Sequence, residues 1–213
     1  MQRIIIFANG ELSNPEKARS ILRADDYLIC ADGGTRHVLK LGLQPHLILG
    51  DMDSTEQSVL EKFQADGVIV EHHPRDKNET DLELAIAKAV ELEPREIVIL
   101  AALGGRMDQT LANIALLSGV RRPSLVTRID DGAEEIFFVM EQAQIHGRSG
   151  DIVSLIPWGN PVHGVQTQHL KWPLNSETLQ PDKTRGISNE MTANTASLKI
   201  ESGLLLVIHT RNS

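Results

Sequence analysis

Six short apolar runs alternate with amphipathic segments over residues 1–128, and this alternation restricts the fold more than any other feature of the chain. The runs are rich in Ile, Val and Leu, which is typical of strands buried on both faces. Between them, apolar residues recur at helical spacing, most clearly from Leu82 to Leu92. The pattern predicts an α/β domain in which helices cover both faces of a Rossmann-like parallel sheet.

The predicted elements of this domain follow one another along the chain. The strands are residues 3–8, 27–31, 47–49, 68–71, 96–101 and 124–129. The helices lie near residues 15–22, 35–41, 56–64, 80–92 and 109–118. Because the strands run parallel, their carboxyl ends share one edge of the sheet, and ligands bind in the crevice beyond that edge.

The pattern of apolar and polar residues changes after about residue 128. Short β-rich segments separated by Gly, Pro and Asn follow, at residues 135–140, 151–156, 164–171, 196–200 and 204–208. No long helical period accompanies them. Residues 129–213 are therefore predicted to form a second domain, an antiparallel β-sandwich. The polar stretch 175–185 contains Pro181 and is predicted to be a mobile loop.

Composition excludes several classes of partner. The formal net charge is −8, with 15 basic and 19 acidic side chains up to residue 128 and 6 and 10 after it. Without a basic region, a nucleic-acid partner is not expected. The single cysteine, Cys30, lies in an apolar run, which fits a buried residue and a reducing, cytoplasmic location. No segment has the length of a membrane span, and the N-terminal apolar run is too short for a signal peptide.

Aspartates follow the predicted strands at the edge where ligands bind. They are Asp32, Asp51 and Asp53, Asp81, and Asp108. If the strands are parallel, these carboxylates gather in one crevice. Oxygen clusters of this kind suit Mg²⁺ and, through it, a polyphosphate. The aspartates thus predict a metal-dependent site.

The motifs after the second and third predicted strands combine aspartate with glycine. In residues 50–54 (Gly-Asp-Met-Asp-Ser), Gly50 permits a turn that lets both carboxylates face one cation, and Ser54 can cap the next helix. An ordinary loop at a helix start is the alternative. Gly33 and Gly34 follow Asp32 and can let an anion approach the backbone, or can simply form a turn.

The other two motifs combine carboxylates with cations. Thr80 is a candidate helix cap, Asp81 lies in the first turn, and Lys77 can reach an anion, although acidic residues are routine at helix starts. In residues 104–108 (Gly-Gly-Arg-Met-Asp), Arg106 suits a bidentate clamp on phosphate, or a surface ion pair with Asp108.

Other nucleotide sites lack their fingerprints. The chain contains no G-x-x-x-x-G-K-[ST] loop, and the first strand is not followed by G-x-G-x-x-G. His72 and His73 have no matching carboxylate or Cys spacing for a metal, so they fit a partly exposed strand end better.

The four motifs, at residues 31–34, 50–54, 79–81 and 104–108, resemble those of the thiamine pyrophosphokinase family in order and spacing. Residues 170–174 and 185–190 resemble the β-sandwich domain of the same family. One departure is Gln168-His169, where the family has a glycine shortly before the tryptophan.

The resemblance implies an ATP:thiamine diphosphotransferase that moves the terminal diphosphate of ATP onto the hydroxyl of thiamine and releases AMP. It implies Mg²⁺ as cofactor, with Asp51, Asp53 and Asp81 as catalytic and metal-binding residues. It also implies a homodimer with thiamine at the subunit interface. The residues expected to contact the nucleotide, the phosphates or thiamine are Asp32, Gly33, Gly34, Ser54, Lys77, Thr80, Gly105, Arg106, Asp108, Trp172, Ser188 and Asn189.

The chemistry of the residues agrees with this resemblance. Acidic loops repel ATP unless a metal intervenes, and they favour the cationic thiazolium of thiamine. Stacking or cation–π contact on Trp172 can add about 0.5–2 kcal/mol, although a core tryptophan is the alternative. Trp158, between Pro157 and Gly159, is predicted to be structural.

Two other functions remain open at this point. A diphosphokinase for another alcohol, such as 6-hydroxymethylpterin, would share the aspartate loops and differ in the second domain, where Trp172 and residues 186–189 favour thiamine. A non-catalytic Mg-nucleotide sensor would have lost one or more aspartates, and none is missing.

Overall fold

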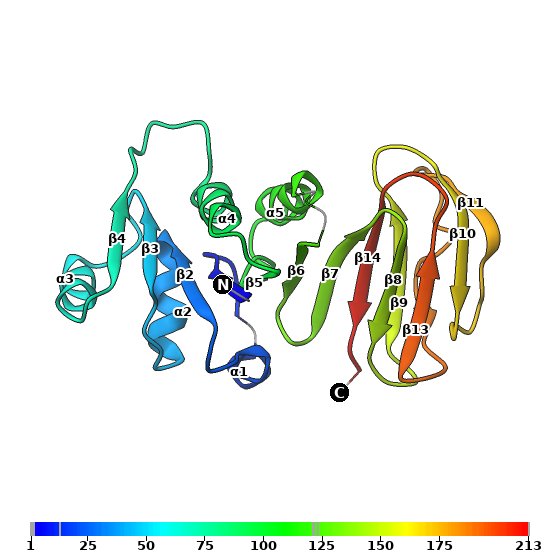
Figure 1. Cartoon of the computed structure of the whole chain (residues 1–213), viewed down its shortest axis with the longest axis horizontal. Helices are drawn as coiled ribbons and strands as arrows, with labels where there is room; N and C mark the ends of the chain where they lie inside the picture. Colours follow the sequence, from blue (N-terminus) through cyan, green and yellow to red (C-terminus); the bar gives the residue numbers. More distant parts are fainter. Residues whose placement is uncertain (1–2, 13, 121, 123, 213) are drawn as a thin grey trace. The chain divides into compact units, whose positions relative to one another are not determined.

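The computed structural model describes residues 3–12, 14–120, 122 and 124–212. The chain forms two compact units, residues 1–132 and 133–213, so the boundary falls shortly after the predicted one at 128 (Figure 1). Within the described residues, no helix combines the length and the apolar character needed to span a membrane.

The first unit is the predicted α/β structure with parallel strands. Its strands are β1 (Arg3–Phe7), β2 (Tyr27–Ala31), β3 (Leu47–Gly50), β4 (Ile69–His72), β5 (Glu96–Leu100) and β6 (Val126–Asp130). Its helices are α1 (Pro15–Ile21), the 3₁₀ turn η1 (Asp32–Gly34), α2 (Thr35–Lys40), α3 (Gln57–Ala65), α4 (Asp81–Glu91) and α5 (Met107–Gly119). The strands lie in the order β6-β5-β1-β2-β3-β4, and every pairing among them is parallel.

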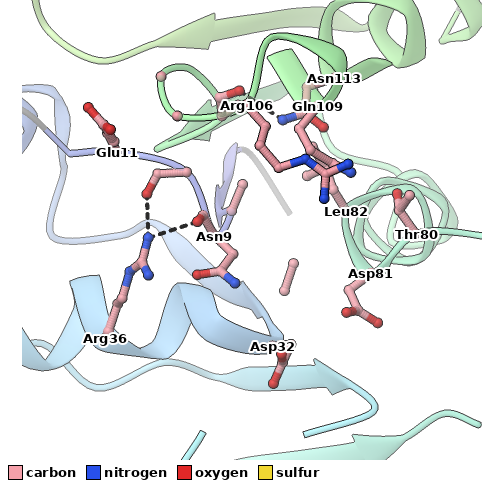
Figure 2. A pocket seen from close by; sticks show the side chains of 16 residues that line it. Asn9, Glu11, Asp32, Arg36, Thr80, Asp81, Leu82, Arg106, Gln109 and Asn113 are labelled. Carbon is pink, nitrogen blue, oxygen red and sulfur yellow. Dashed lines mark hydrogen bonds between the residues drawn. The ribbon is translucent and has the colours of Figure 1, made fainter. Parts of the chain in front are cut away.

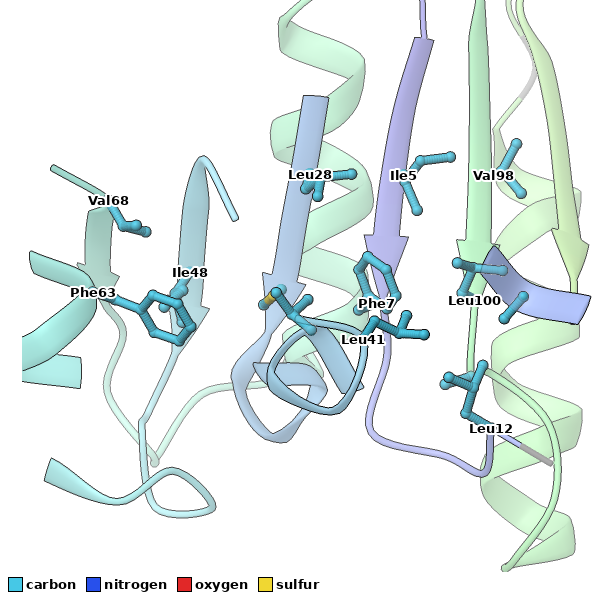
Figure 3. Packing of buried hydrophobic residues seen from close by; sticks show 14 of the residues in the cluster. Ile5, Phe7, Leu12, Leu28, Leu41, Ile48, Phe63, Val68, Val98 and Leu100 are labelled. Atoms are coloured by element: carbon cyan, nitrogen blue, oxygen red, sulfur yellow. The ribbon is translucent and has the colours of Figure 1, made fainter. Parts of the chain in front are cut away.

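Burial on both faces explains the uninterrupted apolar runs. The residues from Ile4 to Phe7 on β1 are all 0% exposed. Ile5 and Phe7 pack with residues of β2, β5 and the helices α1 to α3 in one cluster (Figure 3). The helix α4 contacts β1, β2 and β3, and it buries its apolar stripe from Leu82 to Ala89. In Figure 1, α4 and α5 lie on the face of the sheet opposite α1 and α2.

The strand order reverses beside β1, which pairs with β2 on one side and with β5 on the other. At such a reversal the loops that follow the two strands diverge, which opens a crevice at the carboxyl edge of the sheet. The register aligns Phe7 with both Cys30 and Leu100, so β1, β2 and β5 end almost level.

The second unit consists of antiparallel strands. They are β7 (Glu134–Val139), β8 (Gln142–His146), β9 (Ile152–Pro157), β10 (Val162–Gln168), β11 (Asn175–Leu179), β12 (Asn189–Glu190), β13 (Thr195–Lys199) and β14 (Leu205–Thr210). One layer has the order β12-β9-β14-β7 and the other the order β11-β10-β13-β8. A single apolar cluster draws side chains from both layers, among them Leu155 and Val207 from the first and Val165 and Leu198 from the second.

The predicted loop 175–185 is wrong in its first part, because residues 175–179 form β11, which pairs antiparallel with β10. Only Leu179 on this edge strand is fully buried, so the strand has almost no apolar alternation to reveal it. The ion pair of Arg185 with Glu177 (2.9 Å) ties the following turn back to the strand. The strand β8 was missed for the same reason, since only Ile145 is buried among exposed polar residues.

A buried histidine lies in the polar part of the second unit. His209 is 0% exposed, and its Nε2 and Nδ1 lie 3.1 Å from Asp151 Oδ2 and 3.4 Å from Glu135 Oε2. Burial alone would lower the pKa of His209, but the two carboxylates outweigh it and the pKa is raised. Burial would raise the pKa of Asp151, but the N–H groups of Arg148 and Asn212, followed by His209, outweigh it and the pKa is lowered.

We expect His209→Gln to lower the free energy of unfolding by roughly 3 kcal/mol at pH 6, because it removes the charged partner of a buried carboxylate. The pKa of His209 is raised above its unfolded value of about 6.5, so this stabilisation is complete below that pH. It is lost as the pH rises through the folded-state pKa. Denaturant titrations should therefore show a smaller loss at pH 9 than at pH 6. The exposed His146→Gln is the control, and an equal loss for His209→Gln at both pH values would contradict the assignment.

Candidate active site

A cavity of about 460 Å³ opens at the carboxyl edge of the parallel sheet, beside the reversal of strand order (Figure 2). The loops after β1, β2 and β5 and the start of α4 line it. The polar lining residues labelled in Figure 2 are Asn9, Glu11, Asp32, Arg36, Thr80, Asp81, Arg106, Gln109 and Asn113. This is the edge at which the sequence predicted a ligand.

Three aspartates converge near this cavity. One carboxylate oxygen each from Asp32, Asp51 and Asp53 lies within 4.8 Å of the others. Asp32 follows β2 and is buried, whereas Asp53 follows β3 and is exposed. Met52, which lies between Asp51 and Asp53 in the chain, has a left-handed backbone (φ 61). The N–H of Asp53 donates to Asp51 Oδ1 (3.1 Å). Gly50, where the sequence predicted the turn, also has a positive φ (143), and the two residues together turn the loop so that both carboxylates face the same point.

The electrostatics of the cluster favour a cation. Burial raises the pKa of Asp32, and the charges of Asp81, Asp51 and Asp53 raise it further, while the Ser54 hydroxyl opposes them. Asp32 also has an unusual backbone for a residue with a side chain (φ 38), and such strain is concentrated at functional sites. Oxygen donors from carboxylates are the ligands that Mg²⁺ prefers. The residues present therefore fit a magnesium ion.

Asp81 lies beside this cluster but has a different partner. It opens α4, where Thr80 Oγ1 caps the helix by accepting from the N–H of Glu83 (3.2 Å). Its carboxylate forms an ion pair with Lys77 Nζ at 2.9 Å. The sequence predicted Asp81 as a metal ligand together with Asp51 and Asp53. Among the described residues, the three carboxylates that lie close to one another are instead those of Asp32, Asp51 and Asp53.

The two glycines after Asp32 serve packing. A Cβ on Gly34 would lie 2.0 Å from the carbonyl oxygen of Phe7, and one on Gly33 would lie 2.4 Å from Asn9 Oδ1. Protein atoms therefore fill the space that a Cβ would need at either position. Both glycines let η1 approach the end of β1 closely, which brings Asp32 to the cavity.

The motif after β5 contains the surface ion pair that the sequence left as an alternative. Arg106 Nε donates to Asp108 Oδ1 at 3.1 Å, and the two side chains are 74% and 64% exposed. Arg106 and Gly105 nevertheless line the cavity, and a Cβ on Gly105 would have no atom within 4 Å. This loop is therefore the open side of the site.

Several lining residues were not predicted. Asn9, Gly10 and Glu11 follow β1, and the rule that ligands bind beyond carboxyl ends could have indicated them. Asn113 braces the opposite loop, because its Nδ2 donates to the carbonyl of Ala102 (2.8 Å). Arg36 lies on the short helix α2, where nothing in the local sequence distinguishes it from a surface residue.

The predicted residues of the second unit have distinct environments. Asn189 is buried, and its amide accepts from the N–H of Trp172 (3.0 Å) and donates to its carbonyl (2.7 Å). The amide thus positions Trp172, whose ring is half exposed with Lys171 Nζ 5.1 Å from its centroid. Ser188 is exposed, and its N–H donates to Ser154 Oγ (3.0 Å). Trp158 packs edge-to-face on Phe138, which confirms its structural role.

We expect Gly50→Ala to weaken metal binding at least about tenfold, as displacement of groups that orient metal ligands does. The new Cβ would lie 2.8 Å from Asp32 Cβ and 3.1 Å from Asp81 Oδ1, in a backbone with φ +143. Titration with Mn²⁺ as a probe measures the effect. Gly67→Ala is the matched control, since it adds backbone strain (φ +87) with no atom within 4 Å. Equal Mn²⁺ affinity in both variants would contradict the close approach at Gly50.

Comparison with known proteins identifies both units of the chain. Residues 18–129 match the family model described as thiamin pyrophosphokinase, catalytic domain, and residues 140–205 match the thiamin pyrophosphokinase, vitamin B1 binding domain. The chain is 29% identical to thiamine pyrophosphokinase of Bacillus subtilis over 184 residues, which cover 85% of this chain and 86% of that protein. It is 26% identical to thiamine pyrophosphokinase 1 of Oryza sativa over 208 residues, covering 86% and 79% of the two chains.

Solved structures agree as well. The crystal structure of thiamine pyrophosphokinase from Bacillus subtilis superposes with a TM-score of 0.89 and 26% identity over the full length of both chains. Thiamin pyrophosphokinase from Candida albicans shares the fold, with a TM-score of 0.85 at 16% identity over 99% of this chain and 89% of that one. Because the catalytic-domain model alone spans more than half of the sequence, this chain belongs to the thiamin pyrophosphokinase family.

Proposed function

We propose that the protein transfers the diphosphate of ATP to the hydroxyl of thiamine, giving thiamine diphosphate and AMP. The observation that carries the proposal is the convergence of Asp32, Asp51 and Asp53 beside the cavity of the unit that matches the family's catalytic domain. The match of the second unit to a vitamin B1 binding domain supports thiamine as the acceptor. The first unit is then a Rossmann-like nucleotide-binding domain, and the second is a thiamine-binding β-sandwich.

Diphosphate transfer asks a protein mainly to position the reactants and to neutralise phosphate charge. We assign the metal to Asp51 and Asp53 together with Asp32, and Mg²⁺ bound there would neutralise phosphate oxygens. The ion pair with Lys77 holds Asp81 at the cavity wall, where its carboxylate can orient the attacking hydroxyl. Thr80 and Gly105 line the same cavity, and we assign them to contacts with the phosphates.

Thiamine is cationic and aromatic, and both properties match the residues assigned to it. The acidic lining of Glu11, Asp32 and Asp81 favours the thiazolium charge. The half-exposed ring of Trp172, positioned by Asn189, offers a stacking surface, with Ser188 nearby in the sequence. We further propose a cytoplasmic homodimer in which this surface belongs to the partner subunit, and light scattering of the purified protein tests the dimer.

The alternatives have less support. A pterin diphosphokinase would share the aspartate loops, but the match of residues 140–205 to a vitamin B1 binding domain favours thiamine. A sensor without catalysis has no specific observation in its favour, because all the aspartates predicted for the site are present.

The proposal is tested by incubating the purified protein with ATP, Mg²⁺ and thiamine, with 6-hydroxymethylpterin in a parallel reaction. We expect AMP and thiamine diphosphate to form in equal amounts and to disappear when EDTA removes the metal. If AMP forms only in the reaction with the pterin, thiamine is not the acceptor. If AMP forms in neither reaction, the proposed enzymatic activity is wrong.

Two isosteric variants separate metal binding from the other roles of the aspartates. We expect Asp53→Asn to weaken Mn²⁺ binding at least about tenfold. Asp81→Asn should leave Mn²⁺ binding to the free protein close to that of the wild type but lower kcat by about 10²-fold or more, as loss of a positioning group does. If Asp81→Asn weakens Mn²⁺ binding as much as Asp53→Asn, then Asp81 is a metal ligand, as the sequence predicted. Near-native kcat in Asp81→Asn would contradict any catalytic role.

A further inference from the structure

Arg36 is an unassigned cation in the lining of the cavity. It lies on α2, four positions after Asp32, and its Nη2 donates to the carbonyl oxygens of Asn9 and Gly10, both at 2.7 Å (Figure 2). Its Nε lies 3.3 Å from His37 Nε2. Three contacts therefore fix the orientation of an exposed guanidinium at the wall of the cavity.

The partners of Arg36 are all neutral, in contrast to those of the neighbouring cations. Lys77 is paired with Asp81 and Arg106 is paired with Asp108. Within the described part of the chain, no carboxylate lies within the 4.0 Å of an ion pair with Arg36. Backbone carbonyls orient a guanidinium without cancelling its charge. Arg36 thus brings a full, fixed positive charge to a cavity whose other unshared charges are acidic.

The position of this charge follows from the order of the strands. Asp51 and Asp53 follow β3, Asp32 follows β2, and the carbonyls that hold Arg36 follow β1. Since β3, β2 and β1 are neighbours in this order, the carbonyls that hold the guanidinium follow a strand farther along the edge from β3 than the one that Asp32 follows, and Arg36 and Asp32 line the same cavity. A phosphate chain with its terminal diphosphate at the aspartates, running along this edge toward β1, would present its next phosphate to Arg36.

We infer that Arg36 binds the α-phosphate of the nucleotide, the group that leaves as AMP. This inference rests on the proposed diphosphate transfer. In that reaction a bond forms between the thiamine oxygen and the β-phosphorus, and the hydroxyl proton is released. The bond from the β-phosphorus to the oxygen bridging it to the α-phosphorus breaks, and its electron pair stays on that oxygen in AMP. A guanidinium suits the growing charge there, because its positive charge is permanent and the N–H groups of Nη1, which none of the three contacts above uses, can donate to phosphate oxygens.

The test compares Arg36→Gln with Lys40→Gln, which removes the same charge one turn later on α2 without altering the lining of this cavity. We expect Arg36→Gln to weaken AMP binding, measured by calorimetry without metal, at least about tenfold, as loss of a charge-assisted phosphate contact does. The kcat/KM for ATP should fall at least as much. The KM for thiamine and the affinity for Mn²⁺ should stay within about twofold of the wild type, which is under 0.5 kcal/mol.

A structural role for Arg36 predicts a different result. If the two carbonyl contacts only brace the loop after β1, Arg36→Gln would lower the Tm by more than about 4 °C and change AMP, thiamine and Mn²⁺ binding together. That outcome, or unchanged AMP binding, would overturn the inference, as would an equal effect of Lys40→Gln. Wild-type protein that binds AMP through Arg36 but forms no thiamine diphosphate would overturn the proposed function alone.

Discussion

The parallel pairing of β1 with β2 on one side and β5 on the other is the constraint on which the site depends. The side chains of β1 are buried on both faces of the sheet, so β1 cannot shift its register without exposing a row of apolar side chains to water. The register makes all three strands end almost level. Their loops therefore begin along one line, and the reversal of strand order at β1 opens the cavity between them.

Close backbone approach then brings the acidic groups together. Gly34 lets η1 pack against the end of β1, and Gly50 lets β3 end between Asp32 and Asp81. Neither position has room for a Cβ. Burial, followed by the charges of Asp81, Asp51 and Asp53, raises the pKa of Asp32, so the cluster of carboxylates is unfavourable by itself. A divalent cation bound there, as proposed, would relieve the repulsion. In the second unit, buried polar groups perform a comparable task, because Asn189 positions Trp172 and the carboxylates of Asp151 and Glu135 hold His209.

The predictions from sequence succeeded where the pattern is local. The strands and helices of the first unit lie within a few residues of their predicted positions, because burial on both faces leaves long apolar runs. Predictions failed for β8 and β11, whose polar residues outnumber the inward-facing ones. The aspartates were found because they follow recognisable strands. Arg36 was not, since its importance depends on carbonyls 26 and 27 residues away in the sequence.

The sequence by itself determined the class of the first unit, the edge of the sheet that carries the site, and the acidic chemistry found there. These properties depend on spacing between near neighbours in the chain. Only the tertiary structure decided which charged groups neutralise one another: Lys77 with Asp81, Arg106 with Asp108, and Arg36 with no carboxylate in the described part of the chain. Such pairing depends on distances of a few ångströms between loops from different strands, and those distances are set by the packing of the whole sheet.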